Sequence, residues 1–208
     1  GIEHLAKVVA WARQHGVIVA SDECYAELDW RTDRGGSTAP TTPSILDPRV
    51  TGGSHDGLLC VYSLSKQSNL AGYRAAFVAG DPALVKQLLE VRKHAGMIVP
   101  WPVQVALTAA VSDAAHVEAQ KAVYASRRDA LIEGVRAFGL DITYSDAGLY
   151  LWATAGEDSW ATLERLAARG ILAAPGTFYG AAGRQHVRIA LTATDERISA
   201  AAQRLSAD

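Results

Sequence analysis

The 208-residue sequence has one methionine, two cysteines and few aromatic residues, and neither sign of charge is in excess. Cys24 and Cys60 are too few for a disulfide framework or a four-ligand zinc site. Free thiols fit a reducing compartment, so we expect a cytoplasmic protein. A formal net charge of −2 gives no electrostatic drive toward nucleic acid or anionic lipid. The longest uncharged run, residues 95–112, contains two prolines, so we predict no membrane span.

Metal-ligand spacing and an initiator methionine are also missing. The six histidines are scattered without close spacing, so we predict no metal site. The single methionine, Met97, lies inside the chain, so we expect the sequence to be processed, trimmed or a piece of a longer protein. Hydrophobic residues at 49% and charged residues at 20% are ordinary globular values that exclude disordered and low-complexity classes.

Helices and short apolar strands alternate in the first half of the chain, which predicts an α/β fold. The helix at 2–15 ends at Gly16, and Asp81 followed by Pro82 opens a helix that runs to about residue 94. A short helix follows at 103–111. The apolar strands lie at residues 16–22, 58–62 and 74–80. Residues 31–57 are rich in Gly, Pro, Ser and Thr, which predicts a loop with a short helical turn near Ile45.

The pattern changes after residue 112. Asp113 opens a long helix over about 113–138, which we take as a domain boundary. Short strands follow at residues 149–153, 171–174 and 186–191, with helices at 158–169 and 195–206. This order predicts a βαβ-like α+β unit. We therefore predict two domains, residues 1–112 and 113–208.

Two of the predicted strands end in polar residues that suit catalysis. In α/β sheets, ligands bind at the carboxyl ends of the strands. Lys66 follows an apolar strand directly, so we expect its amine to lose hydration and to attack a carbonyl group. Most lysines in loops are simply solvated. Here the hydroxyls of Ser63 and Ser65 and the guanidinium of Arg74 lie nearby in sequence, and they suit a phosphate group.

An amine that forms a Schiff base beside a phosphate site suggests pyridoxal phosphate. This cofactor also needs an acid at its pyridine nitrogen, and Asp22 stands at the end of the other strand. Taken alone, Asp22 is better interpreted as a turn residue or a helix N-cap. Tyr25, three residues later, is a candidate hydrogen-bond donor to the O3′ oxygen of the cofactor, or an ordinary half-buried tyrosine.

The order and spacing of these residues resemble a known family. The chain carries Asp22-x-x-Tyr25 and then Ser63-x-Ser65-Lys66-x-x-Asn69-x-x-Gly72-x-Arg74. It resembles the fold-type I pyridoxal-phosphate aminotransferases of class I/II. A later segment, Pro175-Gly176-Thr177-Phe178-Tyr179-Gly180 followed by Val187-Arg188-Ile189-Ala190, resembles the region of that family that binds the substrate carboxylate. The sequences of four segments, residues 21–27, 65–74, 92–100 and 191–197, most resemble those of actinobacterial N-succinyldiaminopimelate aminotransferases.

The resemblance implies an architecture and a role for each residue. It implies that the first part belongs to the large pyridoxal-phosphate-binding α/β/α domain, with an incomplete mixed sheet, and that a small α+β domain follows. Lys66 would hold the cofactor and shuttle a proton. Asp22 and Tyr25 would contact the cofactor ring, and Ser63, Ser65 and Arg74 its phosphate. Arg188 would bind the substrate α-carboxylate, although it reads equally as a solvated residue. Tyr150 would line the substrate pocket, or belong to the core.

The resemblance also implies partners and leaves the reaction type open. It implies amino-acid and 2-oxo-acid substrates, transfer of an amino group from N-succinyl-LL-diaminopimelate to 2-oxoglutarate in lysine and diaminopimelate biosynthesis, and a homodimer. The family's chains are longer at the N-terminus, so we expect a C-terminal portion in which one wall of the site is absent. Another class I/II amino-acid aminotransferase, a pyridoxal-phosphate β-lyase and a catalytically inert fragment remain alternatives, because the same lysine serves each enzyme.

Overall fold

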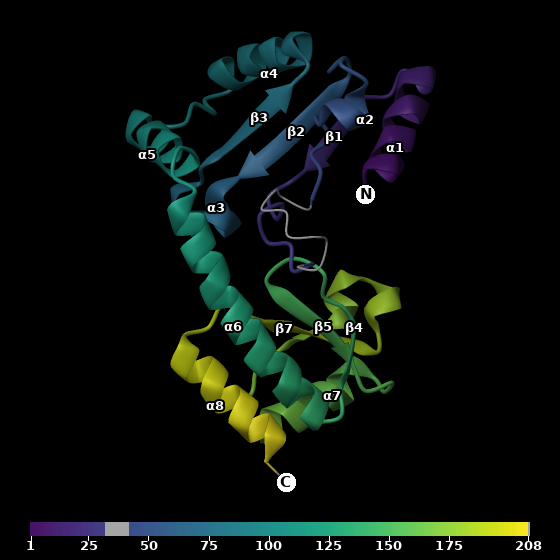
Figure 1. Cartoon of the computed structure of the whole chain (residues 1–208), viewed down its shortest axis with the longest axis vertical. Coiled ribbons are helices and arrows are strands. Elements are labelled where there is room, and N and C mark those ends of the chain that lie inside the picture. The colour runs from purple at the N-terminus through teal and green to yellow at the C-terminus, as the bar shows by residue number, and fades with distance from the viewer. Residues whose placement is uncertain (32–41, 208) are drawn as a thin grey trace. The chain divides into compact units, whose positions relative to one another are not determined.

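The computed structural model describes residues 1–31 and 42–207 (Figure 1). These residues form two compact units. Residues 1–29 and 42–120 make up unit 1, and residues 30–31 and 121–207 make up unit 2. The division falls within a long helix, α6 (Ala115–Ala137). The predicted domain boundary at residues 112–113 stays a prediction.

Unit 1 is built on a three-stranded mixed sheet in which β2 lies between β1 and β3 (Figure 1). β1 runs parallel to β2, and β3 runs antiparallel to β2. This confirms the predicted α/β class with a mixed sheet. In chain order the elements are α1 (Ile2–His15), β1 (Val19–Asp22), α2 (Pro48–Thr51), β2 (Leu58–Ser63), α3 (Leu64–Gln67), a 3-10 turn (Ala71–Tyr73), β3 (Ala76–Gly80), α4 (Pro82–His94) and α5 (Trp101–Val111).

Local sequence signals account for most element boundaries in unit 1. Gly16 ends α1 in the left-handed conformation with φ 64°, where a glycine carries no steric penalty. The Asp81 carboxylate accepts the N–H groups of Ala83 and Leu84 at 2.8 and 3.3 Å, so it caps α4 as predicted. Apolar side chains of α1, α2 and β2 then pack together into a core around Val9, Ile45, Val50, Leu58 and Cys60.

Four predicted boundaries in unit 1 were wrong. The first strand begins at Val19 rather than residue 16, and the third begins at Ala76 because Arg74 adopts a left-handed φ of 54°. α5 begins at Trp101, since a proline fits the first turn of a helix. The short helix of the long loop lies at Pro48–Thr51 instead of near Ile45, because the Asp47 carboxylate accepts the Arg49 N–H there.

Much apolar surface of unit 1 is exposed in the described chain. α4 and α5 bury none of their residues, and Trp101 is 72% exposed. β1 and β3 are the edge strands, so each has one side without a strand partner among the described residues. Exposed edges and apolar faces favour association with other polypeptide segments.

Unit 2 contains a four-stranded antiparallel sheet in the order β4-β5-β7-β6. Its strands are β4 (Asp141–Tyr144), β5 (Tyr150–Thr154), β6 (Ala174–Pro175) and β7 (His186–Ala190). Its helices are the larger part of α6, α7 (Ser159–Ala168) and α8 (Asp195–Ser206). The predicted α+β class is confirmed. β5, α7 and β6 form a βαβ crossover, but β7 lies between the two strands and pairs with both.

One face of this sheet is the core of unit 2. Leu151, Ala153 and Val187 are fully buried, and α6 and α8 contribute Leu131, Val135, Ile198 and Leu205 to the same buried set. α6 and α8 lie side by side (Figure 1), and a Cβ added at Gly134 would come within 3.0 Å of Ala202 Cα. Glycine therefore permits the close approach of these two helices. No helix of the described residues is long and apolar enough to cross a bilayer.

Candidate active site

The candidate cofactor residues lie in unit 1 at the carboxyl ends of β1 and β2. Asp22 is the last residue of β1 and pairs with Val61, and Ser63 is the last residue of β2. Asp22 Oδ1 accepts the N–H of Cys24 at 3.1 Å, which turns the chain toward Tyr25. The Asp22 side chain is otherwise exposed. Parallel pairing of the two strands thus brings the ends that carry Asp22 and Ser63 to the same edge of the sheet.

Lys66 lies in α3, a single helical turn that follows β2 without a loop. Ser63 Oγ accepts the N–H of Ser65 and caps this turn, and Leu64 anchors it in the core with no exposed surface. Lys66 is half-buried, and its Nζ lies 5.8 Å from the centroid of the Tyr25 ring. The structure therefore brings Lys66 and Tyr25 together, as the sequence predicted for the two strand ends.

The three predicted phosphate ligands are only partly gathered. Ser63 Oγ donates a hydrogen bond to Ser65 Oγ at 2.8 Å, so the two hydroxyls are adjacent. Arg74 is exposed, and its Nη1 donates to the carbonyl of Ala71 at 2.9 Å. The N–H of Leu64 donates to the carbonyl of Ala75 at 3.2 Å, which holds the segment after Arg74 against the start of α3. A guanidinium group has five donors, so several remain for a ligand.

Cys24 lies among these residues but is not a nucleophile at neutral pH. Burial raises the pKa of the Cys24 thiol to about 11, and the hydrogen bond to Asp22 adds to this shift. The positive charge of Lys66 opposes this rise in the pKa of Cys24. Since the thiolate is the reactive form, the protonated Cys24 is inert.

The substrate-binding candidates lie on one face of the sheet in unit 2. Tyr150 and Trp152 of β5 and His186 and Arg188 of β7 share this face, because Tyr150, Trp152 and Thr154 pair with Ala190, Arg188 and His186. Arg188 Cζ lies 4.2 Å from the centroid of the Tyr150 ring and 5.2 Å from that of Tyr179. The guanidinium is therefore placed against two aromatic rings, which restrict its orientation.

Arg188 also carries an unsatisfied hydrogen-bond donor. Its Nε is buried and has no acceptor among the described residues. A buried unpaired donor is rare and calls for an explanation such as an absent ligand. A carboxylate suits this donor, because a guanidinium binds carboxylates through two parallel hydrogen bonds. The sequence left open whether Tyr150 lines the substrate pocket or belongs to the core. In the structure Tyr150 is half-buried and lies against Arg188.

Trp152 and His186, near Arg188, did not emerge as site residues from the sequence, and Tyr179 appeared only within the segment that resembles the carboxylate-binding region. Tyr179 reaches Arg188 from the 3-10 turn Gly176–Tyr179. Its ring meets Trp152 edge-on with centroids 5.6 Å apart, and Trp152 stacks on His186 at 5.2 Å. The period-2 alternation of the strands could have placed Trp152 and His186 on this face. The contact of Tyr179 depends on the fold of a distant turn.

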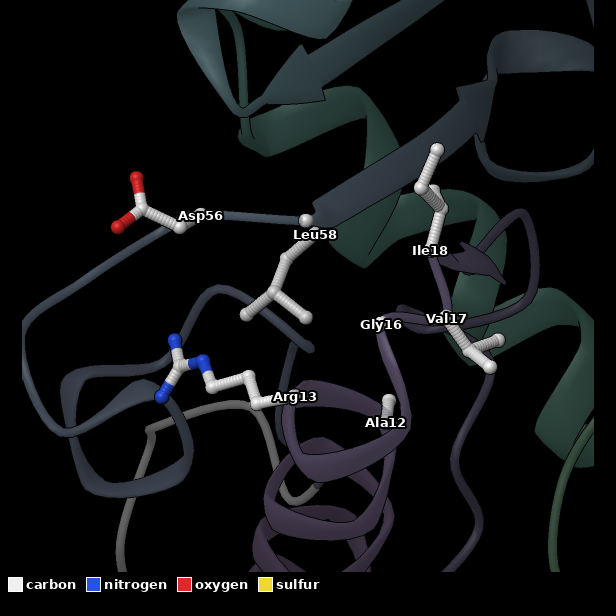
Figure 2. A pocket seen from close by; sticks show the side chains of 8 residues that line it. Ala12, Arg13, Gly16, Val17, Ile18, Asp56 and Leu58 are labelled. Atoms are coloured by element: carbon white, nitrogen blue, oxygen red, sulfur yellow. The ribbon is translucent and has the colours of Figure 1, made fainter.

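The pocket drawn in Figure 2 lies elsewhere in unit 1. It has a volume of about 240 Å³ and is lined by the end of α1 and by the residues that precede β1 and β2. Arg13, its one cation, already donates to the carbonyls of Thr51 and Ser54 at 2.9 and 2.6 Å. This pocket is at the amino ends of the strands, opposite to Asp22 and Ser63, so it is not part of the candidate site.

Comparison with known proteins assigns the family. The family model for aminotransferase class I and II matches residues 2–205. The chain belongs to the class I and II aminotransferases. This family uses pyridoxal phosphate, and the donors of unit 1 fit that group: an amine for the aldehyde, a carboxylate for the pyridine nitrogen, and hydroxyls with a guanidinium for the phosphate. Among residues 1–31 and 42–207, no three His, Cys, Asp or Glu side chains form a potential metal site.

Two curated aminotransferases are similar over almost the whole chain. A Mycobacterium tuberculosis protein whose name reads "probable aminotransferase" is 56% identical over 99% of this chain and 47% of its own length. The 4-dedimethylamino-4-oxo-anhydrotetracycline transaminase OxyQ of Streptomyces rimosus is 55% identical over 99% of this chain and 55% of its own length. The chain therefore spans about half the length of these relatives.

Solved structures of aminotransferases share the fold. One from Neisseria meningitidis superposes with a TM-score of 0.82 at 31% identity, covering 99% of this chain and 52% of that one. One from Staphylococcus aureus has a TM-score of 0.83 at 26% identity, covering 99% and 53%. The predicted α/β architecture is thus the one that these enzymes have.

Proposed function

We propose that the protein is a pyridoxal-phosphate-dependent aminotransferase, with Lys66 as the lysine that holds the cofactor. The observation that carries the proposal is the arrangement at the sheet edge in unit 1. Lys66 Nζ lies over the Tyr25 ring, and Asp22 ends the strand parallel to the one that leads into Lys66. An amine and a carboxylate at adjacent strand ends match the two groups that this cofactor requires.

Each residue has a separate task in this proposal. When bound, the cofactor supplies an electron sink for the electron pair left on the substrate Cα. Lys66 Nζ would carry the proton from the substrate Cα to C4′ of the cofactor, and in the opposite direction when the 2-oxo acid is the acceptor. Asp22 keeps a proton on the pyridine nitrogen, and the hydroxyl of Tyr25 donates to the O3′ oxygen. Ser63, Ser65 and Arg74 hold the phosphate, which fixes the ring against the lysine.

In unit 2, we propose that Arg188 binds the α-carboxylate of the substrate. Its buried unpaired Nε and the flanking ring of Tyr150 support this role. Tyr150 and Tyr179 hold the guanidinium plane, so that a carboxylate finds two donors already oriented. The homodimer expected from the sequence remains part of the proposal.

For the substrates we propose N-succinyl-LL-diaminopimelate and 2-oxoglutarate. LL-diaminopimelate aminotransferases, such as the one of a Nostoc species that is 31% identical over 98% of this chain, support an amino-acid donor of this class. The alternative is another class I/II aminotransferase with a different substrate. The similarity to OxyQ, which is named for a tetracycline precursor, favours keeping that alternative.

A substrate panel tests the reaction type and the substrate together. With 2-oxoglutarate as acceptor, N-succinyl-LL-diaminopimelate is expected to give glutamate at a rate at least about tenfold above unsuccinylated LL-diaminopimelate, because the succinyl group adds a third carboxylate that can accept further charge-assisted hydrogen bonds. Glutamate production is measured by a coupled assay, with ammonia and pyruvate measured in parallel. Release of ammonia and pyruvate without an acceptor would identify a β-lyase instead. Transfer that occurs only from other amino acids would keep the aminotransferase and overturn the succinylated substrate.

A further inference from the structure

Three polar side chains connect the end of α3 with the first turn of α6, and Figure 1 shows these two helices beside each other. His116 Nε2 lies 2.9 Å from Ser68 Oγ, and His116 Nδ1 lies 3.2 Å from Asp113 Oδ2. The other carboxylate oxygen of Asp113 accepts the N–H of Ala115 at 3.0 Å. All of these atoms belong to unit 1. We refer to the three residues as the Asp113–His116–Ser68 chain.

The partners of His116 determine which of its ring nitrogens donates a hydrogen bond and which accepts one. In the neutral ring, Nδ1–H donates to the Asp113 carboxylate, so Nε2 accepts the hydroxyl proton of Ser68. In the charged ring both nitrogens donate, and the Ser68 oxygen accepts. A serine hydroxyl serves in either direction, so the connection persists in both protonation states of His116.

The Asp113–His116–Ser68 chain acts on the short helix that carries Lys66. Ser68 is the C-cap of α3, and the N–H groups of Ser68 and Leu70 both donate to the Leu64 carbonyl, at 3.1 and 3.2 Å. A helix of four residues is not stable without tertiary contacts. The buried Leu64 holds its beginning, and the bond from His116 to Ser68 holds its end.

We propose that His116 is a positioning residue for Lys66. Held by Asp113, it fixes Ser68 and thereby the end of α3, and this directs the Lys66 side chain toward Tyr25. The inference rests on the proposed function, because Lys66 needs a defined direction only if it reacts with the cofactor. His116 is 48 residues away from Ser68 in the sequence and acts through it.

Amide hydrogen exchange of the cofactor-free protein tests whether the hydrogen bond between His116 and Ser68 stabilises the end of α3. The His116→Ala variant is expected to exchange the amides of Ser68 and Leu70 about fivefold faster, as for the loss of one hydrogen bond. Ser68→Ala is expected to give the same increase at Leu70, and the double variant no more than either single one. His94→Ala, at an exposed histidine of α4, is the matched control and should change neither amide. Unchanged exchange in His116→Ala, or additive effects in the double variant, would overturn the inference.

Covalent capture of pyridoxal phosphate at Lys66, trapped with borohydride and located by peptide mass mapping, tests the consequence. His116→Ala is expected to slow capture at Lys66 about fivefold. His116→Gln, which keeps an amide nitrogen near the position of Nε2, should restore both the capture rate and the slow exchange. Equal capture by the parent chain and His116→Ala would overturn the positioning role while leaving Lys66 as the cofactor lysine. Absence of capture at Lys66 in the parent chain would contradict the proposed function, and the positioning role with it.

Discussion

Replacing Arg188 by alanine is expected to lower kcat/KM for the amino-acid substrate by about 100- to 10,000-fold, since two charge-assisted hydrogen bonds to the carboxylate are lost. The residue is half-buried on a central strand, its guanidinium lies against Tyr150 and Tyr179, and its Nε has no acceptor among the described residues. The alanine variant removes both the charge and the oriented donors. Steady-state kinetics of amino-group transfer measure the effect.

Two further variants separate carboxylate binding from general charge. Arg188→Lys keeps the charge but loses the planar pair of donors. Its kcat/KM is therefore expected to lie between those of the parent protein and the alanine variant. Arg184→Ala removes an exposed arginine of the same unit that faces Asp158 at 3.5 Å, and it should leave kcat/KM unchanged. If Arg188→Ala and Arg184→Ala behaved alike, Arg188 would not bind the substrate.

Replacing Gly176 by alanine is expected to destabilise unit 2 by about 3 kcal/mol, the upper range for overpacking a rigid site. A Cβ at Gly176 would lie 2.1 Å from the Gly183 carbonyl oxygen and 2.6 Å from that of His186. A Cβ added at Gly183 would likewise lie 2.2 Å from the carbonyl oxygen of Gly176. These are backbone atoms, so relief requires two segments of the chain to separate.

Urea denaturation of the Gly176→Ala variant measures the loss of stability. Gly139→Ala is the matched control, because Gly139 also lies in unit 2, has φ +87° and has nothing within 4 Å of an added Cβ. The free energy of unfolding of Gly139→Ala should fall by only about 1–2 kcal/mol, the cost of placing a non-glycine residue in the left-handed conformation. Gly176 begins the turn that ends at Tyr179, so the variant should also alter Trp152 fluorescence through the Tyr179 contact. An equal effect of both substitutions would show that the two segments are not in close contact.

Elements with strong local signals could be predicted from the sequence. The apolar run before Ser63 predicted β2, and Asp81 with Pro82 predicted the start of α4. β4 was missed because three of its four residues are exposed, so no apolar alternation marks it. The strand predicted at 171–174 shrinks to Ala174–Pro175, since Ile171 and Leu172 are apolar but do not pair.

For the candidate site too, the sequence predicts the residues that have a local signal and misses the contacts that depend on the tertiary fold. Lys66 and Asp22 could be found because the ends of apolar strands are local features with a known spatial consequence. The alternation of side chains along β7 puts Arg188 on the face opposite Val187 and Ile189, which are buried. Tyr179 against Arg188 and His116 against Ser68 could not be predicted, because both contacts join residues far apart or in irregular turns.

Lys66 as the cofactor lysine is the central claim, and site-resolved capture of pyridoxal phosphate tests it most directly. The chain has five lysines, and Lys66 alone among them follows a buried strand directly. After reduction with borohydride and peptide mapping, we expect modification at Lys66 to exceed that at exposed Lys86 and Lys93, and the visible absorbance of the bound cofactor to disappear in Lys66→Ala. Modification spread evenly over the lysines, with the same absorbance in Lys66→Ala, would contradict the account.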